Sequence, residues 1–189
     1  METVEQDLVG ALATLRSGGI ILYPTDTIWG IGCDATDPQA VEKIYRLKNR
    51  SDQKAMVVLV ADERDILQHV AAPDMEVFNY LEQCQKPTTV IYEGALGLAP
   101  NLLAPDGSVG IRICNDPFCR HLIKRFRKPI VATSANISGE KTPANFQEIS
   151  AAIKQGVDYT VHWRQDEKKE AEASSVIRWN NGKVELIRS

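Results

Sequence analysis

The densest group of potentially reactive side chains lies at residues 23–35, which read Tyr-Pro-Thr-Asp-Thr-Ile-Trp-Gly-Ile-Gly-Cys-Asp-Ala. Two threonine hydroxyls, the Asp26 carboxylate and two glycines follow a proline that fixes the start of the turn. Glycine lets another molecule approach the main chain closely. We therefore expect a loop that presents polar groups to a small ligand. Asp26 could serve acid–base or metal chemistry, or it could simply stabilise the turn.

Three cations, Lys48, Arg50 and Lys54, occur within seven residues just after a helical pattern. Such a group would suit a polyanion such as a triphosphate. On a continuing helix Lys48 and Arg50 would point to different faces, so a joint role requires the chain to leave the helix there. The alternative is that they are ordinary helix C-terminal cations favoured by the helix macrodipole.

Two more groups lie on or beside buried strands. Ser134 and Asn136 follow an apolar run at residues 129–133, and the ends of strands are where open α/β sheets bind ligands. Arg112 interrupts another apolar strand, with Ser108 four residues earlier. An inward arginine needs a counter-anion, whether a ligand carboxylate or a protein acid. The alternatives are a turn rich in its usual residues and an arginine that faces outward.

The elements that must position these residues alternate along the chain. Helical patterns are predicted at residues 4–16, 38–47, 73–84, 117–126 and 145–154. Strands are predicted at residues 19–22, 56–60, 88–92, 109–113 and 129–133, followed by a hairpin of 175–179 and 183–187. The charged segment 164–172 is expected to be a solvated loop. The fold class is therefore α/β with a mixed sheet.

Composition limits the possible functions. The 189 residues predict a single domain over 1–189, and 22 Lys and Arg against 25 Asp and Glu give a formal charge of −3. This net charge gives no reason to expect nucleic-acid binding, although a local basic face is not excluded. The four cysteines have no metal-binding spacing, and no apolar run is long enough to cross a membrane. We expect a soluble, cytoplasmic protein with reduced thiols.

Several common sites have no matching motif. The sequence contains neither the phosphate-binding P-loop pattern nor the dinucleotide-binding glycine pattern. The three histidines are scattered, so neither a histidine metal site nor a catalytic triad is indicated. The residues alone therefore predict a polar pocket without naming a reaction.

Taken together and in this order, the motifs resemble the YrdC/TsaC family of threonylcarbamoyl-AMP synthases. They are residues 24–35, Lys48-Asn49-Arg50 as the family's Lys-x-Arg, Arg112 on its strand, and Ser134-Ala135-Asn136 as its Ser-x-Asn. The resemblance runs from about Val4 to Arg188. It implies a YrdC-like twisted, open mixed sheet with flanking helices and a concave ligand-binding face. It also implies the synthesis of threonylcarbamoyl-AMP and pyrophosphate from L-threonine, bicarbonate and ATP.

The resemblance also implies roles for individual residues. Threonine would be bound by Thr27, Arg112, Ser134 and the Ser174-Ser175 pair. ATP would be bound by Lys48, Arg50, Lys54, Ser108, Asn136 and Arg188, with Lys48 and Arg50 as the catalytic cations. Mg²⁺ would accompany ATP, with no metal ligand assigned to a protein side chain. Implied partners are tRNA or other double-stranded RNA and a downstream threonylcarbamoyl transferase complex, and no membrane.

The sequence departs from the family pattern at several places. Residues 83–89 replace a Trp-Pro-Gly-type turn, Ile113-Cys114 stands where Arg-x-Pro is usual, and the charged 164–172 segment replaces a glycine-rich approach to Ser-Thr-Val. The sequence ends one residue after Arg188, so no further C-terminal domain is expected. Two alternatives to the synthase are a nucleotide- or RNA-binding relative without this activity, and carbamoyl-adenylate chemistry on another amine.

Overall fold

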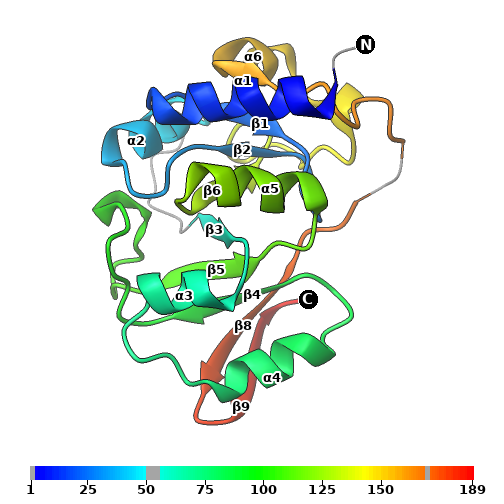
Figure 1. Cartoon of the computed structure of the whole chain (residues 1–189). Coiled ribbons are helices and arrows are strands. Elements are labelled where there is room, and N and C mark those ends of the chain that lie inside the picture. Colours follow the sequence, from blue (N-terminus) through cyan, green and yellow to red (C-terminus); the bar gives the residue numbers. More distant parts are fainter. Residues whose placement is uncertain (1–2, 50–55, 169–170) are drawn as a thin grey trace.

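A single mixed sheet organises the protein (Figure 1). The computed structural model describes residues 3–49, 56–168 and 171–189. Nine strands of these residues hydrogen-bond in the order β7-β1-β2-β6-β3-β5-β4-β8-β9. Their bounds are β1 Ile21–Tyr23, β2 Gly30–Gly32, β3 Val57–Val60, β4 Thr88–Tyr92, β5 Val109–Ile113, β6 Ile130–Ser134, β7 Tyr159–Thr160, β8 Ser175–Asn180 and β9 Lys183–Arg188.

The helices pack against this sheet through two hydrophobic clusters. The described α-helices are α1 Val4–Arg16, α2 Pro38–Leu47, α3 Glu63–His69, α4 Glu76–Gln83, α5 Pro117–Phe126 and α6 Ala151–Gly156, with short 3₁₀ turns at Pro100–Leu102 and Phe146–Glu148. Helices α1 and α5 lie side by side over the upper half of the sheet in Figure 1 and share one cluster with Leu59 and Ile130. Helices α2, α3 and α4 contribute to the other cluster, which contains Val58 and Val60. Because alternate residues of a strand point to opposite faces, the two clusters cover opposite faces of β3.

Strand register places the predicted site on the face that α1 and α5 cover in part. Arg112 lies opposite Leu59, and Gly110 lies opposite Val57, in the parallel pair of β5 and β3. Val57 in turn lies opposite Ala132 of the antiparallel neighbour β6. These residues therefore share the face of Leu59, beyond the area that the two helices cover.

The predicted elements are largely confirmed, with differences that have local causes. Helices α1, α2 and α5 and strands β4 and β5 have the predicted bounds, and Asn181 and Gly182 take positive φ in the predicted hairpin turn. The helix expected at 145–154 is instead a 3₁₀ turn and α6, because the Ser150 side chain accepts the Ile153 N–H and starts a new helix. Helix α3 and strand β2 were not predicted. No described helix is long and apolar enough to cross a membrane.

A buried carboxylate joins α1 to the chain after β7. Asp7 is 1% exposed, and its side chain accepts hydrogen bonds from the Tyr159 hydroxyl and from the backbone N–H groups of His162 and Trp163 at 2.8–3.0 Å. Burial alone would raise the pKa of Asp7, but hydrogen bonds from His162, Trp163 and Tyr159 outweigh it and hold the pKa below its ordinary value. The carboxylate therefore fixes residues 159–163 against α1.

The first prediction concerns this anchor. Asp7→Asn is expected to lower the free energy of unfolding at pH 7 by about 2–3 kcal/mol, because an amide NH₂ would face backbone donors. Since the native pKa is lowered, the difference from wild type is present above the unfolded pKa of about 3.8 and is lost as pH falls through the native value. Urea unfolding at pH 7 and pH 3 measures it. Asp166→Asn, at an exposed acid beyond the anchored residues, is the control, and equal effects of the two variants would contradict the anchoring role.

Candidate functional site

Five of the predicted site residues meet around one small cavity of about 220 Å³. Its walls come from the loop after β1, the end of β6, the middle of β5, the approach to β8 and the end of β9. The predicted residues that line it are Thr27, Arg112, Ser134, Ser174 and Arg188. Residues up to 161 positions apart in the sequence are therefore brought together by the sheet order.

A second cavity, of about 460 Å³, adjoins the first on the same face. The two cavities share Met56, Val57 and Arg188, and the second also contains Ser108. Its floor is apolar. At Gly110 the floor leaves little room for a side chain, because a Cβ there would lie 3.1 Å from the Thr89 methyl group. The site is therefore one surface with a small polar compartment and a larger, less polar one.

Arg112 points into the protein and is paired by Asp26. One of its terminal nitrogens donates to Asp26 Oδ1 at 3.0 Å and to Thr27 Oγ1 at 3.1 Å, and the two charged side chains are 5% and 7% exposed. The Asn115 N–H donates to the other Asp26 oxygen at 3.2 Å. The expected counter-anion is thus a protein acid, and the outward-facing alternative is wrong. Arg112 Nε is buried and has no hydrogen-bond partner among the described residues.

The loop after β1 is held in one conformation by its own hydroxyls. Thr25 Oγ1 donates to the Ile28 carbonyl at 2.8 Å, accepts the Thr27 N–H at 3.1 Å, and lies 3.0 Å from Thr27 Oγ1. Since the single Thr25 proton goes to Ile28, the Thr27 hydroxyl must donate to Thr25 and accept from Arg112. The position of Thr27 is therefore determined before any ligand arrives.

Lys48 lies beneath the loop that follows β6. Helix α2 ends at Leu47, with Lys48 as its C-cap, and Asn49 takes a positive φ of 50°. The chain therefore leaves the helix at this point, which is the condition stated above for Lys48 and Arg50 to act together. Lys48 Nζ donates to the Ser134 carbonyl and, at 2.7 Å, to the Asn136 carbonyl, and the side chain is buried. Arg50 and Lys54 lie outside the described residues. Lys48 therefore fixes the Ser134–Asn136 loop.

The remaining predicted residues differ in their placement. Ser108 donates to Asp106 at 2.6 Å, and Ser174 lies 2.9 Å from Thr89 Oγ1 and accepts from Arg188 through its carbonyl. Ser175 pairs in register with Thr88, which lines a different cavity, so Ser174 rather than Ser175 reaches the site.

Asn136 is buried, and its amide donates to the Ile137 and Glu140 carbonyls. Its Oδ1 has no partner among the described residues. The thiols of Cys33 and Cys119 are unsuited to nucleophilic catalysis, since burial raises the pKa of both. The site therefore works through fixed donors and cations.

Arg164 was missed, and the expectation that residues 164–172 form a solvated loop is wrong for this residue. Arg164 is 25% exposed and adopts a positive φ of 68°. Its guanidinium donates to the Thr25 carbonyl at 3.1 Å, to Asp116 at 2.9 Å and to Glu167 at 2.8 Å. Thr25 lies 139 residues away in the sequence, so no local pattern could have identified this contact.

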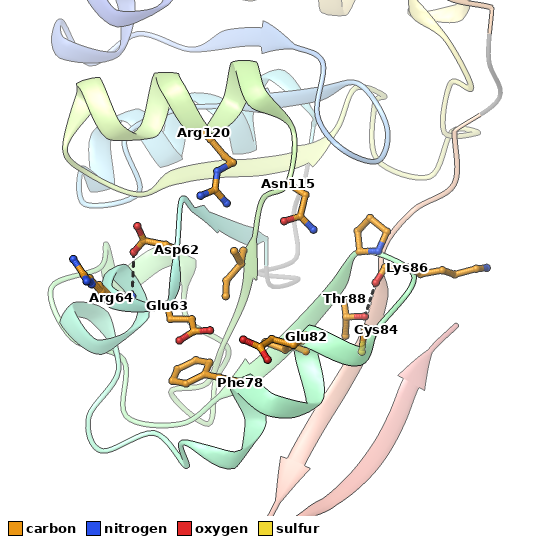
Figure 2. A pocket seen from close by; sticks show the side chains of 13 residues that line it. Asp62, Glu63, Arg64, Phe78, Glu82, Cys84, Lys86, Thr88, Asn115 and Arg120 are labelled. Atoms are coloured by element: carbon orange, nitrogen blue, oxygen red, sulfur yellow. Dashed lines mark hydrogen bonds between the residues drawn. The ribbon is translucent and has the colours of Figure 1, made fainter.

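A larger cavity, of about 560 Å³, lies elsewhere and contains none of the predicted site residues. It opens beyond the carboxyl ends of β3 and β5, between Arg120 of α5 and the side chains of Glu63 and Phe78 (Figure 2). A cavity of about 600 Å³ between α4 and the hairpin of β8 and β9 also contains none of them, so size alone would have selected the wrong place, and the predicted chemistry gathers in the two smaller cavities.

Comparison with known proteins gives the family. The Sua5/YciO/YrdC family model, described as telomere recombination, matches residues 13–189. The chain is 32% identical over 152 residues to the threonylcarbamoyl-AMP synthase of Stenotrophomonas maltophilia, covering 79% of this chain and 82% of that protein. It is 33% identical over 143 residues to the human protein of that name, covering 75% and 50%. The chain belongs to the Sua5/YciO/YrdC family.

Solved structures share the fold. P. abyssi Sua5 complexed with L-threonine has a TM-score of 0.83 at 20% identity, over 100% of this chain and 55% of that one. E. coli YciO also has a TM-score of 0.83 at 20% identity, over 100% and 91% of the two chains. The chain thus spans little more than half of the Sua5 chain and nearly all of YciO. The open mixed sheet expected from the resemblance is confirmed.

The second prediction tests the Arg164 contact. Arg164→Ala is expected to speed amide hydrogen exchange at Thr27 about tenfold or more, because the loop loses one donor and Asp116 loses its charge partner. Exchange followed residue by residue measures this. Lys168→Ala, an exposed change in the same segment, is the control. Unchanged exchange at Thr27 in the Arg164 variant would show that the loop holds its shape without this contact.

Proposed function

We propose that this protein is an L-threonylcarbamoyladenylate synthase, a nucleotidyltransferase that acts in tRNA modification. The observation that carries the proposal is the meeting of Thr27, Arg112 and Ser134 around a small cavity that adjoins a larger one. The names of its relatives in bacteria and humans support the same activity. Threonine and ATP are the two organic substrates of such an enzyme, and two adjoining compartments of unequal size suit one small and one large substrate.

We assign the smaller compartment to L-threonine. Arg112 lines this cavity, and within the described residues its guanidinium donates from one terminal nitrogen only, so the other terminal nitrogen can donate to a carboxylate. Asp26 already occupies one terminal nitrogen, so it fixes the guanidinium in place and lowers the cost of its burial. The Thr27 and Ser134 hydroxyls line the same cavity and can bind the hydroxyl and amine of threonine. Ser174 closes the opposite wall.

We assign the larger compartment to the nucleoside of ATP. Val57, Ile91 and Val176 give it an apolar floor, and Ser108 lies at its edge. Arg188 lines both compartments, and we place the α-phosphate there, next to the threonine site. The β- and γ-phosphates then fall to Arg50 and Lys54, while Lys48, which is 2% exposed and donates to the Ser134 and Asn136 carbonyls, shapes the loop beside them.

Mg²⁺ is proposed to enter with ATP. Among residues 3–49, 56–168 and 171–189, no three His, Cys, Asp or Glu side chains lie close enough to hold a metal ion. The ion would therefore be held through phosphate oxygens, where it would neutralise charge on the triphosphate. The protein would contribute its cations, which would neutralise the remaining charge on the phosphates.

The residues fit a reaction that needs positioning more than a covalent nucleophile. The neutral amine of threonine would attack CO₂ and release a proton to solvent, or attack bicarbonate and expel water, and either route gives a carbamate. A carbamate oxygen would then attack the α-phosphorus of ATP, and pyrophosphate would leave. Arg112 and Thr27 would hold one reactant, while Arg188 would meet charge on the other. No described cysteine or histidine is needed for these steps.

The reactivity of the product indicates what must happen after this reaction. A threonylcarbamoyl-adenylate is a reactive mixed anhydride, so a transferase complex that modifies tRNA must consume it. We place the protein in the cytoplasm, where the tRNA that this complex modifies is found. The relatives' names support this assignment only through the shared activity.

The third prediction tests the reaction itself. Incubation with ATP, Mg²⁺, bicarbonate and L-threonine is expected to release pyrophosphate only when all the substrates are present. Pyrophosphate release is followed by a coupled assay, and the adenylate is identified by mass spectrometry. ATP binding without threonine-dependent release would instead support a nucleotide-binding relative that lacks the synthase activity.

The fourth prediction tests the threonine compartment. Arg112→Gln is expected to raise the KM for threonine by about tenfold to a hundredfold, because a charge-assisted hydrogen bond is worth about 1.5–3 kcal/mol. The KM for ATP should change much less. Arg64→Gln, in the larger and separate cavity, is the matched control. An equal rise in both Michaelis constants would contradict the assignment of Arg112 to threonine.

A further inference from the structure

The cavity of about 560 Å³ lies where two neighbouring strands send the chain to opposite faces of the sheet. Strands β3 and β5 are parallel neighbours. After β3 the chain enters α3, which packs into the cluster that contains Val58 and Val60. After β5 it enters α5, which packs into the cluster that contains Leu59. Such a divergence leaves a crevice outside the carboxyl ends of the two strands, which is where open α/β sheets bind ligands.

The walls of this cavity carry three acids and three cations, and half of them have no counter-charge. The six residues are Asp62, Glu63, Glu82, Arg64, Lys86 and Arg120. Asp62 accepts the Arg64 backbone N–H at 3.1 Å as the N-cap of α3, and Lys86 pairs with Glu172 at 3.1 Å. The side chains of Glu63, Glu82 and Arg120 form no hydrogen bond or ion pair with any residue that the structure describes.

These unpaired charges are separated by sign. Figure 2 shows Arg120 of α5 and the side chain of Asn115 on one side of the cavity, and Glu63 of α3 and Glu82 of α4 on the other. Glu63 and Arg120 are half-buried, and a charge that is partly removed from water without a partner costs free energy. A ligand with an anionic group at one end and a cationic group at the other would pair with both sides.

Apolar side chains line the same cavity and limit the ligand further. Phe78 is 4% exposed, and Leu81 and Ile113 are half-buried. The ligand must therefore carry an apolar body as well as its two charges. A polyphosphate does not fit a cavity with three carboxylates, and within the described part of the chain no three His, Cys, Asp or Glu side chains could hold a metal ion.

We propose that this cavity binds a zwitterionic dipeptide with apolar side chains. The two charges of a free amino acid are carried on one carbon atom, whereas a dipeptide separates them by a peptide bond and so suits charges on opposite walls. The ammonium group pairs with Glu63 and Glu82, the carboxylate accepts from Arg120, and a side chain packs on Phe78. No residue of this cavity lines either cavity of the functional site, so the proposal does not depend on the synthase assignment.

The test measures binding of leucyl-leucine to the full chain by isothermal titration calorimetry. Two blocked forms, N-acetyl-leucyl-leucine and leucyl-leucine amide, each lose one charge and keep the apolar body. Each is expected to bind about tenfold more weakly or worse, because it loses charge-assisted hydrogen bonds. Equal affinity for all three peptides, or no binding of leucyl-leucine at millimolar concentration, would overturn the proposal.

Variants of the two walls assign each charge of the ligand. Arg120→Gln is expected to bind leucyl-leucine about tenfold more weakly and to bind the amide form as the wild type does, since that form has no carboxylate. Glu63→Gln/Glu82→Gln is expected to weaken leucyl-leucine and to leave the acetylated form unchanged. Because each variant must still bind one blocked form normally, a variant that has merely unfolded is recognised. Equal weakening of both blocked forms by a folded variant would contradict the assignment.

Two further measurements control for charge and for location. Lys124→Gln and Glu76→Gln/Glu185→Gln change exposed residues that do not line the cavity, and both should bind leucyl-leucine as the wild type does. Cys84 lines the cavity and the other three cysteines are buried, so a thiol reagent should modify Cys84 selectively in the folded protein. Bound leucyl-leucine is expected to slow this modification. An unchanged rate with the peptide bound would place the peptide elsewhere and overturn the proposal.

Discussion

The buried pair of Arg112 and Asp26 is the interaction on which the site depends. An arginine that is 5% exposed on a central strand is tolerated only with a counter-charge, and Asp26 supplies it from a loop 86 residues earlier. The same guanidinium holds the Thr27 hydroxyl and retains one buried nitrogen without a partner in the described structure. One ion pair thus closes the loop onto the sheet and leaves the second terminal nitrogen of Arg112 for a ligand in the cavity that this residue lines.

The surrounding structure supports this pair from two sides. On one side the backbone N–H of Asn115, just before α5, donates to Asp26 and so holds the loop. On the other side Arg164 donates to the Thr25 carbonyl, and Asp7 fixes the preceding residues to α1. Polar groups on separate segments therefore determine the shape of one short loop. This kind of support is what a site that works by positioning requires.

The sequence predicted what depends on local patterns. Periodicity gave the bounds of α5 and β5, and the ordered motifs selected Thr27, Arg112 and Ser134, which meet at one cavity. It could not distinguish Ser174 from Ser175, because that choice depends on the strand register.

Contacts between residues far apart in the sequence could not be predicted from local patterns either. Arg164 looked like part of a solvated charged run, because its partners lie far away in the sequence. The partner of Arg112 was foreseen as a chemical need but not as Asp26. The roles of Arg50 and Lys54 stay predictions.

The central claim is that the small cavity beside Arg112 is a threonine site. A crystal structure of the protein soaked with L-threonine tests it most directly. The account predicts density in the 220 Å³ cavity, with the carboxylate beside the second terminal nitrogen of Arg112 and the Asp26 pair intact. Threonine bound in the 560 Å³ cavity near Arg120, with the small cavity empty, would contradict it.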